Sequence, residues 1–225
     1  MKEKPEQQKL KFNPLYGAVG FLFVMVVALN FGYPITLSIG PLGIILFLTG
    51  YALMFVIGVL VTSDDRNSLI RTSFAALAWM VASVLATIFP GNVFLSVLQF
   101  MAFIPCLLLI IGALFGFIFN AQMVDGRVLI TAITIYILLG SLFTPLYGMI
   151  EFLSPHSFID NGLGQPVQWQ QLIYYSMITL TTVGYGDIIP VNAWARTLAA
   201  LEGMTGVLYI AVLMGRLVGI YRQEK

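Results

Sequence analysis

Charge is scarce in this chain of 225 residues: only 9% of the residues are charged, and 59% are hydrophobic. Ordinary soluble domains carry roughly a quarter charged residues. A chain of this length cannot bury so much apolar surface in one aqueous core, so the composition predicts a protein whose solvent is the bilayer. The formal net charge of +1 gives no reason to expect a nucleic-acid partner.

Cysteine and histidine each occur once, as Cys106 and His156. A single cysteine excludes a disulfide framework and a multi-cysteine metal site within one chain. The sequence also offers no cluster of metal-binding histidines and no nucleophile paired with a base. We therefore expect neither an enzyme nor a bound cofactor.

Long apolar runs are what the chain has in abundance. A hydrocarbon core about 30 Å thick takes roughly 20 residues of helix. Six runs are near that length, with short breaks such as "NFGYP" that carry turn residues. They are residues 15–31, 41–62, 69–89, 93–119, 128–150 and 194–220. We expect an all-α integral membrane protein with six transmembrane helices.

The basic residues predict the orientation of these helices, because cytoplasmic loops carry an excess of Lys and Arg. With a cytoplasmic N-terminus, ten of the eleven basic residues lie inside and only Arg196 lies outside. The ten are Lys2, Lys4, Lys9, Lys11, Arg66, Arg71, Arg127, Arg216, Arg222 and Lys225. The prediction is a multi-pass protein of the cell membrane with both termini cytoplasmic, and residues 151–190 face outward.

The outward segment contains a stretch too short to cross the membrane. Residues 168–180 are about 13 helix-compatible residues, or about 20 Å of helix at 1.5 Å per residue. Non-helical backbone at membrane depth persists only where protein buries it or water lines it. A re-entrant half-helix followed by "TTVGYGD", residues 181–187, meets that requirement.

The glycines of this motif allow an unusual backbone. Gly184 and Gly186 can adopt left-handed conformations at little steric cost. Val183 and Tyr185 are then expected to turn away and pack against surrounding protein, which leaves a row of backbone carbonyls. Such a row can replace the water around a dehydrated monovalent cation.

"TTVGYGD" resembles the selectivity filter of the potassium channel family, and the match is complete. The resemblance implies K⁺ sites at the carbonyls of Thr182, Val183, Gly184 and Tyr185, with the Thr182 hydroxyl. It also implies a pore helix near 168–180, an outer helix at 128–150 and an inner helix at 194–221. One chain supplies one loop, so a closed ring needs identical subunits, and the family implies four. The small charged tails suggest a prokaryotic source.

The resemblance also implies filter support from Thr181, Gly186 and Asp187. In the family this carboxylate bonds to an aromatic residue of the pore helix, and Tyr174 and Tyr175 occupy that place here. The alternative is that Asp187 is only a solvated carboxylate at the mouth.

Glu202 lies in the last apolar run, where an ionisable group suggests function. It either braces the pore helix through Ser176 or Thr179, which would set the stability of the filter, or it lies near a watery crevice. Gly206 follows Asp187 by nineteen residues, the spacing of the family's hinge glycine. Gly203 and Gly206 therefore serve either as a gating hinge or in close helix packing.

The organisation is predicted as a cytoplasmic tail at 1–14, a four-helix membrane domain at 15–124 and a pore domain at 125–225. The run 93–119 takes the place of a voltage-sensing helix but contains no Lys or Arg. Gating charges must cross the field, so little intrinsic voltage sensing is expected.

Passive K⁺ conduction is the main hypothesis, and a potassium transporter component or a regulatory membrane subunit is the alternative. Lipids are expected partners, a separate cytosolic regulatory subunit has no sequence support, and no gating stimulus is indicated.

Overall fold

The computed structural model describes residues 14–39, 41–61, 66–89, 91–162 and 167–223, in which helices predominate. The predicted tail at 1–14 lies almost entirely outside these residues. The helices are α1 (Pro14–Phe31), α2 (Tyr33–Ser38), α3 (Pro41–Val61), α4 (Arg66–Ile88), α5 (Val93–Asn120), α6 (Gly126–Leu153), α7 (Gln171–Leu180) and α8 (Ala193–Gln223).

Five of the described helices, namely α3, α4, α5, α6 and α8, are long and apolar enough to cross a membrane. The helix α1 coincides with the remaining predicted run, and its described apolar part, Gly17–Phe31, is shorter. Polar caps explain where two of the helices begin. The Asn92 side chain accepts from the Leu95 backbone N–H before α5, and Asp125 accepts from the N–H groups of Arg127 and Val128 before α6.

Two local features add detail to the predicted organisation. The predicted break at "NFGYP" falls at Gly32, between the end of α1 and the start of α2. The Gly32 N–H still donates to the Ala28 carbonyl at 2.8 Å, and the short helix α2 follows at once. Proline at the start of α2 fits there because a first-turn N–H has no helical partner. The structure also contains an antiparallel pair of three-residue strands, β1 (Phe158–Asp160) and β2 (Ile188–Pro190).

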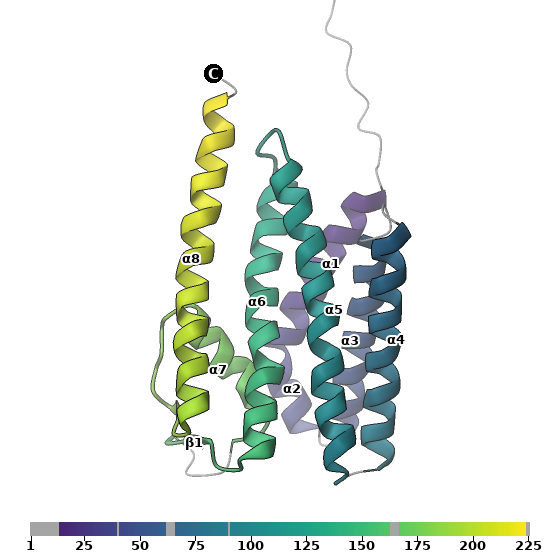
Figure 1. The fold of residues 1–225 in the computed structure, drawn as a ribbon, viewed down its shortest axis with the longest axis vertical. Coiled ribbons are helices and arrows are strands. Elements are labelled where there is room, and N and C mark those ends of the chain that lie inside the picture. The colour runs from purple at the N-terminus through teal and green to yellow at the C-terminus, as the bar shows by residue number, and fades with distance from the viewer. Residues whose placement is uncertain (1–13, 40, 62–65, 90, 163–166, 224–225) are drawn as a thin grey trace, which may run out of the picture.

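The long helices lie side by side, and α7 lies between α6 and α8 (Figure 1). The helix α5 packs against α4 on one side and α6 on the other, while α1 contacts α3 and α6. The chain rises along α7 for part of the height of its neighbours and then returns to the end at which it entered (Figure 1). The strand pair β1–β2 ties this returning segment to the chain that follows α6.

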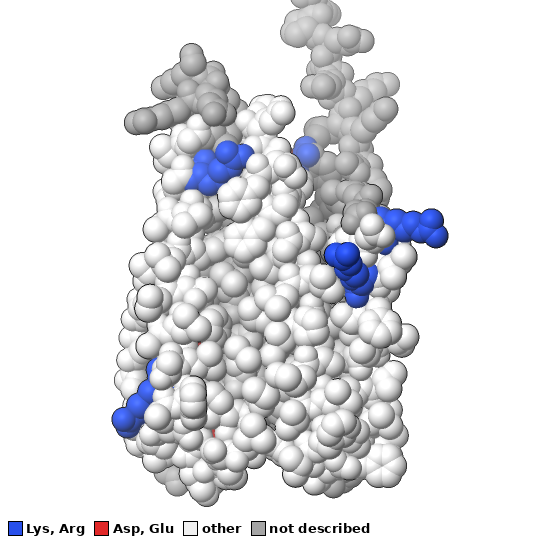
Figure 2. Space-filling view, viewed as in Figure 1, with Lys and Arg blue, Asp and Glu red and all other residues white. Residues whose placement is uncertain are grey.

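The basic side chains gather at one end of the molecule, where α8 terminates, and one cationic side chain lies toward the opposite end (Figure 2). Arg66 begins α4, Arg127 lies in the first turn of α6 and Arg216 lies near the end of α8. These three positions share one end because α6 and α8 run in opposite directions. The charge is therefore distributed asymmetrically along the long axis of the molecule.

Candidate functional site

The candidate site begins where α7 ends. Thr182 N–H donates to the Thr179 carbonyl at 3.0 Å, and the N–H groups of Val183 and Gly184 both donate to the Ile178 carbonyl, at 2.9 and 3.1 Å. The last carbonyls of a helix lack intrahelical partners. The start of the loop supplies those partners, which fixes the direction in which residues 181–187 leave the helix. The helix α7 starts at Gln171 rather than at the predicted 168, because residues 169–170 form a turn.

The loop backbone has the conformation expected from its glycines. Gly184 has φ +50° and Gly186 has φ +78°. Thr182 also has a positive φ, +59°, which costs a non-glycine residue about 1–2 kcal/mol. Within the described part of the chain, the carbonyl oxygens of residues 182–185 accept no hydrogen bond. The loop thus presents four consecutive carbonyls that no group of the described residues satisfies.

The side chains of this loop are less buried than predicted. Val183 is 52% exposed and Tyr185 is 73% exposed, so the described residues of the chain bury neither side chain. Residues 181–186 all lie on the exposed surface of the single chain. The predicted packing against surrounding protein therefore stays a prediction, which would require neighbouring subunits.

Asp187, at the end of the loop, is held by its neighbours. The Tyr174 hydroxyl donates to Asp187 Oδ2 at 2.6 Å, and the Ile188 N–H donates to Oδ1 at 2.9 Å. The Asn161 N–H donates to the Asp187 carbonyl at 2.7 Å. Both carboxylate oxygens therefore have protein partners, and the structure does not favour a carboxylate that is merely solvated.

Tyr174 and Tyr175 do not act as an equivalent pair. Tyr175 points away from Asp187 into a buried aromatic group, with ring centroids 5.0 Å from Tyr147 and 5.2 Å from Phe158. Successive residues of a helix do not face the same side. Only Tyr174 reaches the loop, while Tyr175 fixes α7 against α6 and β1.

Glu202 on α8 is fully buried, with 0% exposure. The Tyr147 hydroxyl is 2.5 Å from Oε2, and the Ser176 hydroxyl is 2.5 Å from Oε1. The Ser176 hydroxyl also lies 2.7 Å from the Gly140 carbonyl. Of the two predicted partners, Ser176 meets Glu202, whereas the Thr179 hydroxyl donates to the Tyr175 carbonyl. The structure does not favour the alternative that Glu202 lies near a watery crevice, because its buried carboxyl group connects α8 to α6 and α7.

Ser176 carries a single hydroxyl proton but contacts two oxygens. If that proton goes to the Gly140 carbonyl, the contact with Glu202 requires a proton on the carboxyl group. A neutral Glu202 satisfies every member of this cluster, and glutamine can imitate it by donating to Ser176 and accepting from Tyr147.

We therefore expect Glu202→Gln to retain most of the stability of the wild type and Glu202→Leu to lose it. Leucine leaves the buried Tyr147 hydroxyl without its acceptor, at a cost of about 1–3 kcal/mol, and removes the carboxyl partner of Ser176, which keeps its bond to the Gly140 carbonyl. Thermal unfolding of the purified protein in detergent measures the difference. A glutamine variant as unstable as the leucine variant would show instead that the negative charge is required.

The two glycines next to Glu202 have different surroundings. A Cβ atom on Gly206 would lie 2.0 Å from the Leu180 carbonyl oxygen, at the end of α7. A Cβ atom on Gly203 would lie 3.7 Å from the Thr179 carbonyl oxygen, an ordinary contact. Gly206 is thus required by the close approach of α8 to α7, and Gly203 is not.

Several residues near the site had not been predicted. The Tyr136 hydroxyl donates to the Leu180 carbonyl at 3.2 Å. Away from the loop, near the end of α8, Arg216 donates to the carbonyls of Phe119, in the last turn of α5, and Ala121, just after it, at 2.7 and 3.3 Å. The sequence shows only that the hydroxyls of Tyr136 and Tyr147 lie in an apolar run. Polar groups in such runs usually have partners, but the sequence does not show which partners these are.

The donor set of the site suits only certain cations. Among the described residues, no group of three or more His, Cys, Asp or Glu side chains could hold a metal ion. The available ligands at residues 182–185 are backbone carbonyls and the Thr182 hydroxyl. Neutral oxygen ligands of this kind replace the hydration shell of a monovalent cation.

Comparison with known proteins finds similarity over part of the chain. A family model described as "Ion channel" matches residues 128–223. The inward rectifier potassium channel Kirbac3.1 of Paramagnetospirillum magnetotacticum is 34% identical over 90 residues, which are 40% of this chain and 28% of that protein. The two-pore potassium channel 4 of Arabidopsis thaliana is 40% identical over 45 residues, 20% of this chain and 16% of that protein.

A third relative is the potassium voltage-gated channel protein shk-1 of Caenorhabditis elegans, 33% identical over 55 residues, 23% of this chain and 10% of that protein. The chain thus spans less than a third of the length of each of these relatives. No solved structure matches the chain. The apolar helices and the matched segment make this a multi-pass membrane protein. Residues 128–223, less than half of the chain, match the ion channel model, and parts of the chain are similar to potassium channels.

Proposed function

We propose that this protein is a potassium-selective channel in which four copies surround one conduction pathway. The observation that carries the proposal is the exposed row of carbonyls at residues 182–185, which accept no hydrogen bond within the described chain and follow a short helix. One chain offers these oxygens on one side only, so an ion needs copies of the loop around it. Closed cyclic symmetry provides them.

The exposed surface beside the loop supports assembly. The helix α8 carries many exposed apolar side chains along its length. In a tetramer, those near the axis would line the pathway and others would meet a neighbouring subunit. Val183 and Tyr185 would then gain the packing that one chain does not give them. The C-terminal end of α7, with its partial negative charge, would face the axis and attract a cation.

The proposed topology has six membrane spans, counting α1, and α7 as a re-entrant pore helix with the filter at 181–187. Residues 15–124 form a peripheral domain, and residues 125–225 form the pore domain. The gathering of basic side chains at the end where α8 terminates favours a cytoplasmic position for that end. The helix α5 contains no Lys or Arg, so we propose little or no intrinsic voltage sensing.

Cation flux through the purified chain in liposomes tests this proposal. Vesicles loaded with KCl and diluted into an impermeant salt are expected to lose K⁺ rapidly, whereas NaCl-loaded vesicles retain Na⁺. Protein-free vesicles give the background. Equal release of both cations, or no release above background, would overturn the proposal.

Tyr174→Phe tests the support of the filter. This change removes the hydroxyl that donates to Asp187 Oδ2, and one such bond has a net value of about 1 kcal/mol, or roughly fivefold in an equilibrium. We expect the ratio of K⁺ to Na⁺ permeability to fall by about that factor. Tyr175→Phe is the matched control, because the side chain of Tyr175 points away from Asp187, and it should keep the wild-type ratio.

A further inference from the structure

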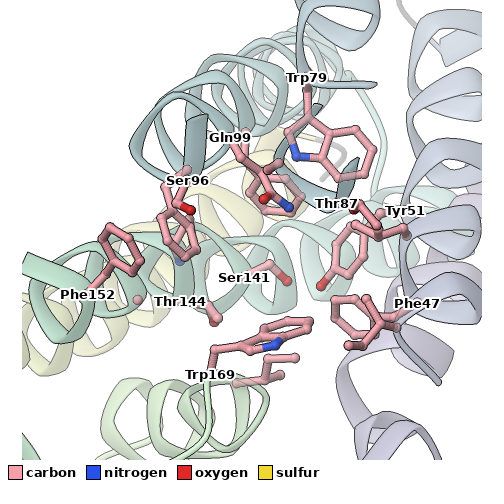
Figure 3. A pocket seen from close by; sticks show the side chains of 18 of the residues that line it. Phe47, Tyr51, Trp79, Thr87, Ser96, Gln99, Ser141, Thr144, Phe152 and Trp169 are labelled. Atoms are coloured by element: carbon pink, nitrogen blue, oxygen red, sulfur yellow. The ribbon is translucent and has the colours of Figure 1, made fainter. Parts of the chain in front are cut away.

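A cavity of about 300 Å³ lies between the peripheral helices and the pore elements. Its walls come from α3, α4 and α5 on one side and from α6, α7 and the turn before α7 on the other. Figure 3 shows side chains from these segments surrounding a common space, with Trp79 at one side and Trp169 at another. The volume corresponds to about ten water molecules of liquid. It also falls within the lower range of small-molecule sites.

The lining of the cavity is aromatic and uncharged. Seven aromatic side chains face it: Phe47, Tyr51, Trp79, Phe100, Phe103, Phe152 and Trp169. No Asp, Glu, Lys, Arg or His is among the lining residues. An ion inside this cavity would lose its hydration without gaining a counter-charge. The chemistry therefore favours a neutral occupant.

Several polar groups in the wall lack a protein partner. Within the described residues, neither the Gln99 amide nor the indole N–H of Trp79 makes a hydrogen bond. Trp79 is only 3% exposed, and buried indole N–H groups usually find a partner. In Figure 3 the Trp79 indole nitrogen and the Gln99 amide lie on the same side of the space. The Trp79 indole N–H can donate a hydrogen bond to a molecule in the cavity, and the Gln99 amide can both donate and accept one.

We propose that this cavity binds a small neutral amphiphile. Its aromatic or alkyl body packs against the aromatic wall, and one uncharged group, an alcohol or an amide, bonds to Gln99 and Trp79. The occupant also touches the pore elements, because Ile173 of α7 and Thr144 of α6 line the same cavity. Binding thus connects the peripheral helices to the helix that holds the loop 181–187.

Tryptophan fluorescence measures binding directly. The chain has three tryptophans, and two of them, Trp79 and Trp169, line the cavity. In a Trp194→Phe background, the remaining emission comes from the cavity alone. The probe is 4-bromobenzyl alcohol, a neutral amphiphile whose bromine quenches indole on contact, added to the full chain in liposomes. Saturable quenching is expected, and the anionic analogue 4-bromobenzoate should give none.

Two variants and one control locate the bound probe. Thr144→Leu fills part of the cavity and should weaken the apparent affinity by about tenfold. Gln99→Met keeps the side-chain length but removes the amide, and should weaken it about fivefold. Thr49→Leu is the matched control, because both threonine hydroxyls donate to the carbonyl four residues earlier, but Thr49 is exposed on α3. It should leave the affinity unchanged.

Quenching that rises linearly with the probe and is equal in all variants would overturn the proposal, since it reports only partition into lipid. Saturable quenching by 4-bromobenzoate of equal affinity would overturn the assignment of a neutral ligand. The effect on conduction rests on the proposed function: the alcohol should change K⁺ flux in the wild type and much less in Thr144→Leu. Binding without any flux in either protein would leave the cavity as a site and contradict the channel proposal alone.

Discussion

Replacing Gly206 by alanine is expected to prevent the protein from folding into a conducting form. The added Cβ would lie 2.0 Å from the Leu180 carbonyl oxygen, and that atom is backbone at the end of α7, which cannot rotate away. The helices α7 and α8 would have to separate, at a cost of about 3 kcal/mol or more for each chain. The same movement pulls α8 from the contact between Glu202 and Ser176.

Gly203→Ala is the matched control for this prediction. The two glycines lie on the same helix, one turn apart, and the Cβ at position 203 meets only an ordinary contact at 3.7 Å. Gly203→Ala should therefore resemble the wild type in thermal stability and in K⁺ flux, while Gly206→Ala loses both. A stable Gly206→Ala protein that conducts but no longer opens and closes would favour the hinge role over close packing.

Gly184→Ala is expected to abolish the preference for K⁺ over Na⁺. Gly184 has φ +50°, where an alanine costs about 1–2 kcal/mol in each chain. The proposed pathway contains four such loops, so the penalty is repeated around the axis and the loops relax to other backbone angles. The carbonyls then no longer surround a dehydrated K⁺, and the ratio of K⁺ to Na⁺ flux should approach about one.

Gly91→Ala separates the filter from general backbone strain. Gly91 also has a positive φ, +89°, and a Cβ there would meet nothing within 4 Å. It lies in the turn between α4 and α5, away from the loop 181–187. The substitution imposes a comparable backbone penalty, and the liposome flux assay should nevertheless report wild-type selectivity. If both alanine variants lose selectivity, strain anywhere in the fold would be sufficient, and the filter assignment would lose its support.

The long helices could be predicted because hydrophobicity over about 20 residues depends only on local sequence. The predicted run at 93–119 corresponds closely to α5, which ends at Asn120. At "NFGYP" a glycine and a proline predicted a break, and α1 ends there at Phe31. The short helix α2 that follows was not predicted, because six residues are too few to give a periodic pattern.

The loop 181–187 could be predicted from its glycines, and the contact between Tyr174 and Asp187 from its resemblance to a known motif. The partners of Glu202 could be foreseen only in part. Ser176 was one of two candidates on α7, whereas Tyr147 lies 55 positions earlier in the chain. Nothing in the local sequence indicates which hydroxyls of α6 will face α8. That pairing depends on how three helices pack.

The central claim is that the loop 181–187 forms a potassium-selective pathway, and a reversal potential tests it most directly. The purified chain would be placed in a planar bilayer with KCl at about a tenfold concentration gradient, and a perfectly K⁺-selective pore then reverses near about 59 mV in magnitude. We expect a value close to that limit, with the sign set by K⁺, and a large shift when NaCl replaces KCl on one side. A reversal potential near zero under the KCl gradient, or no shift with NaCl, would contradict the account.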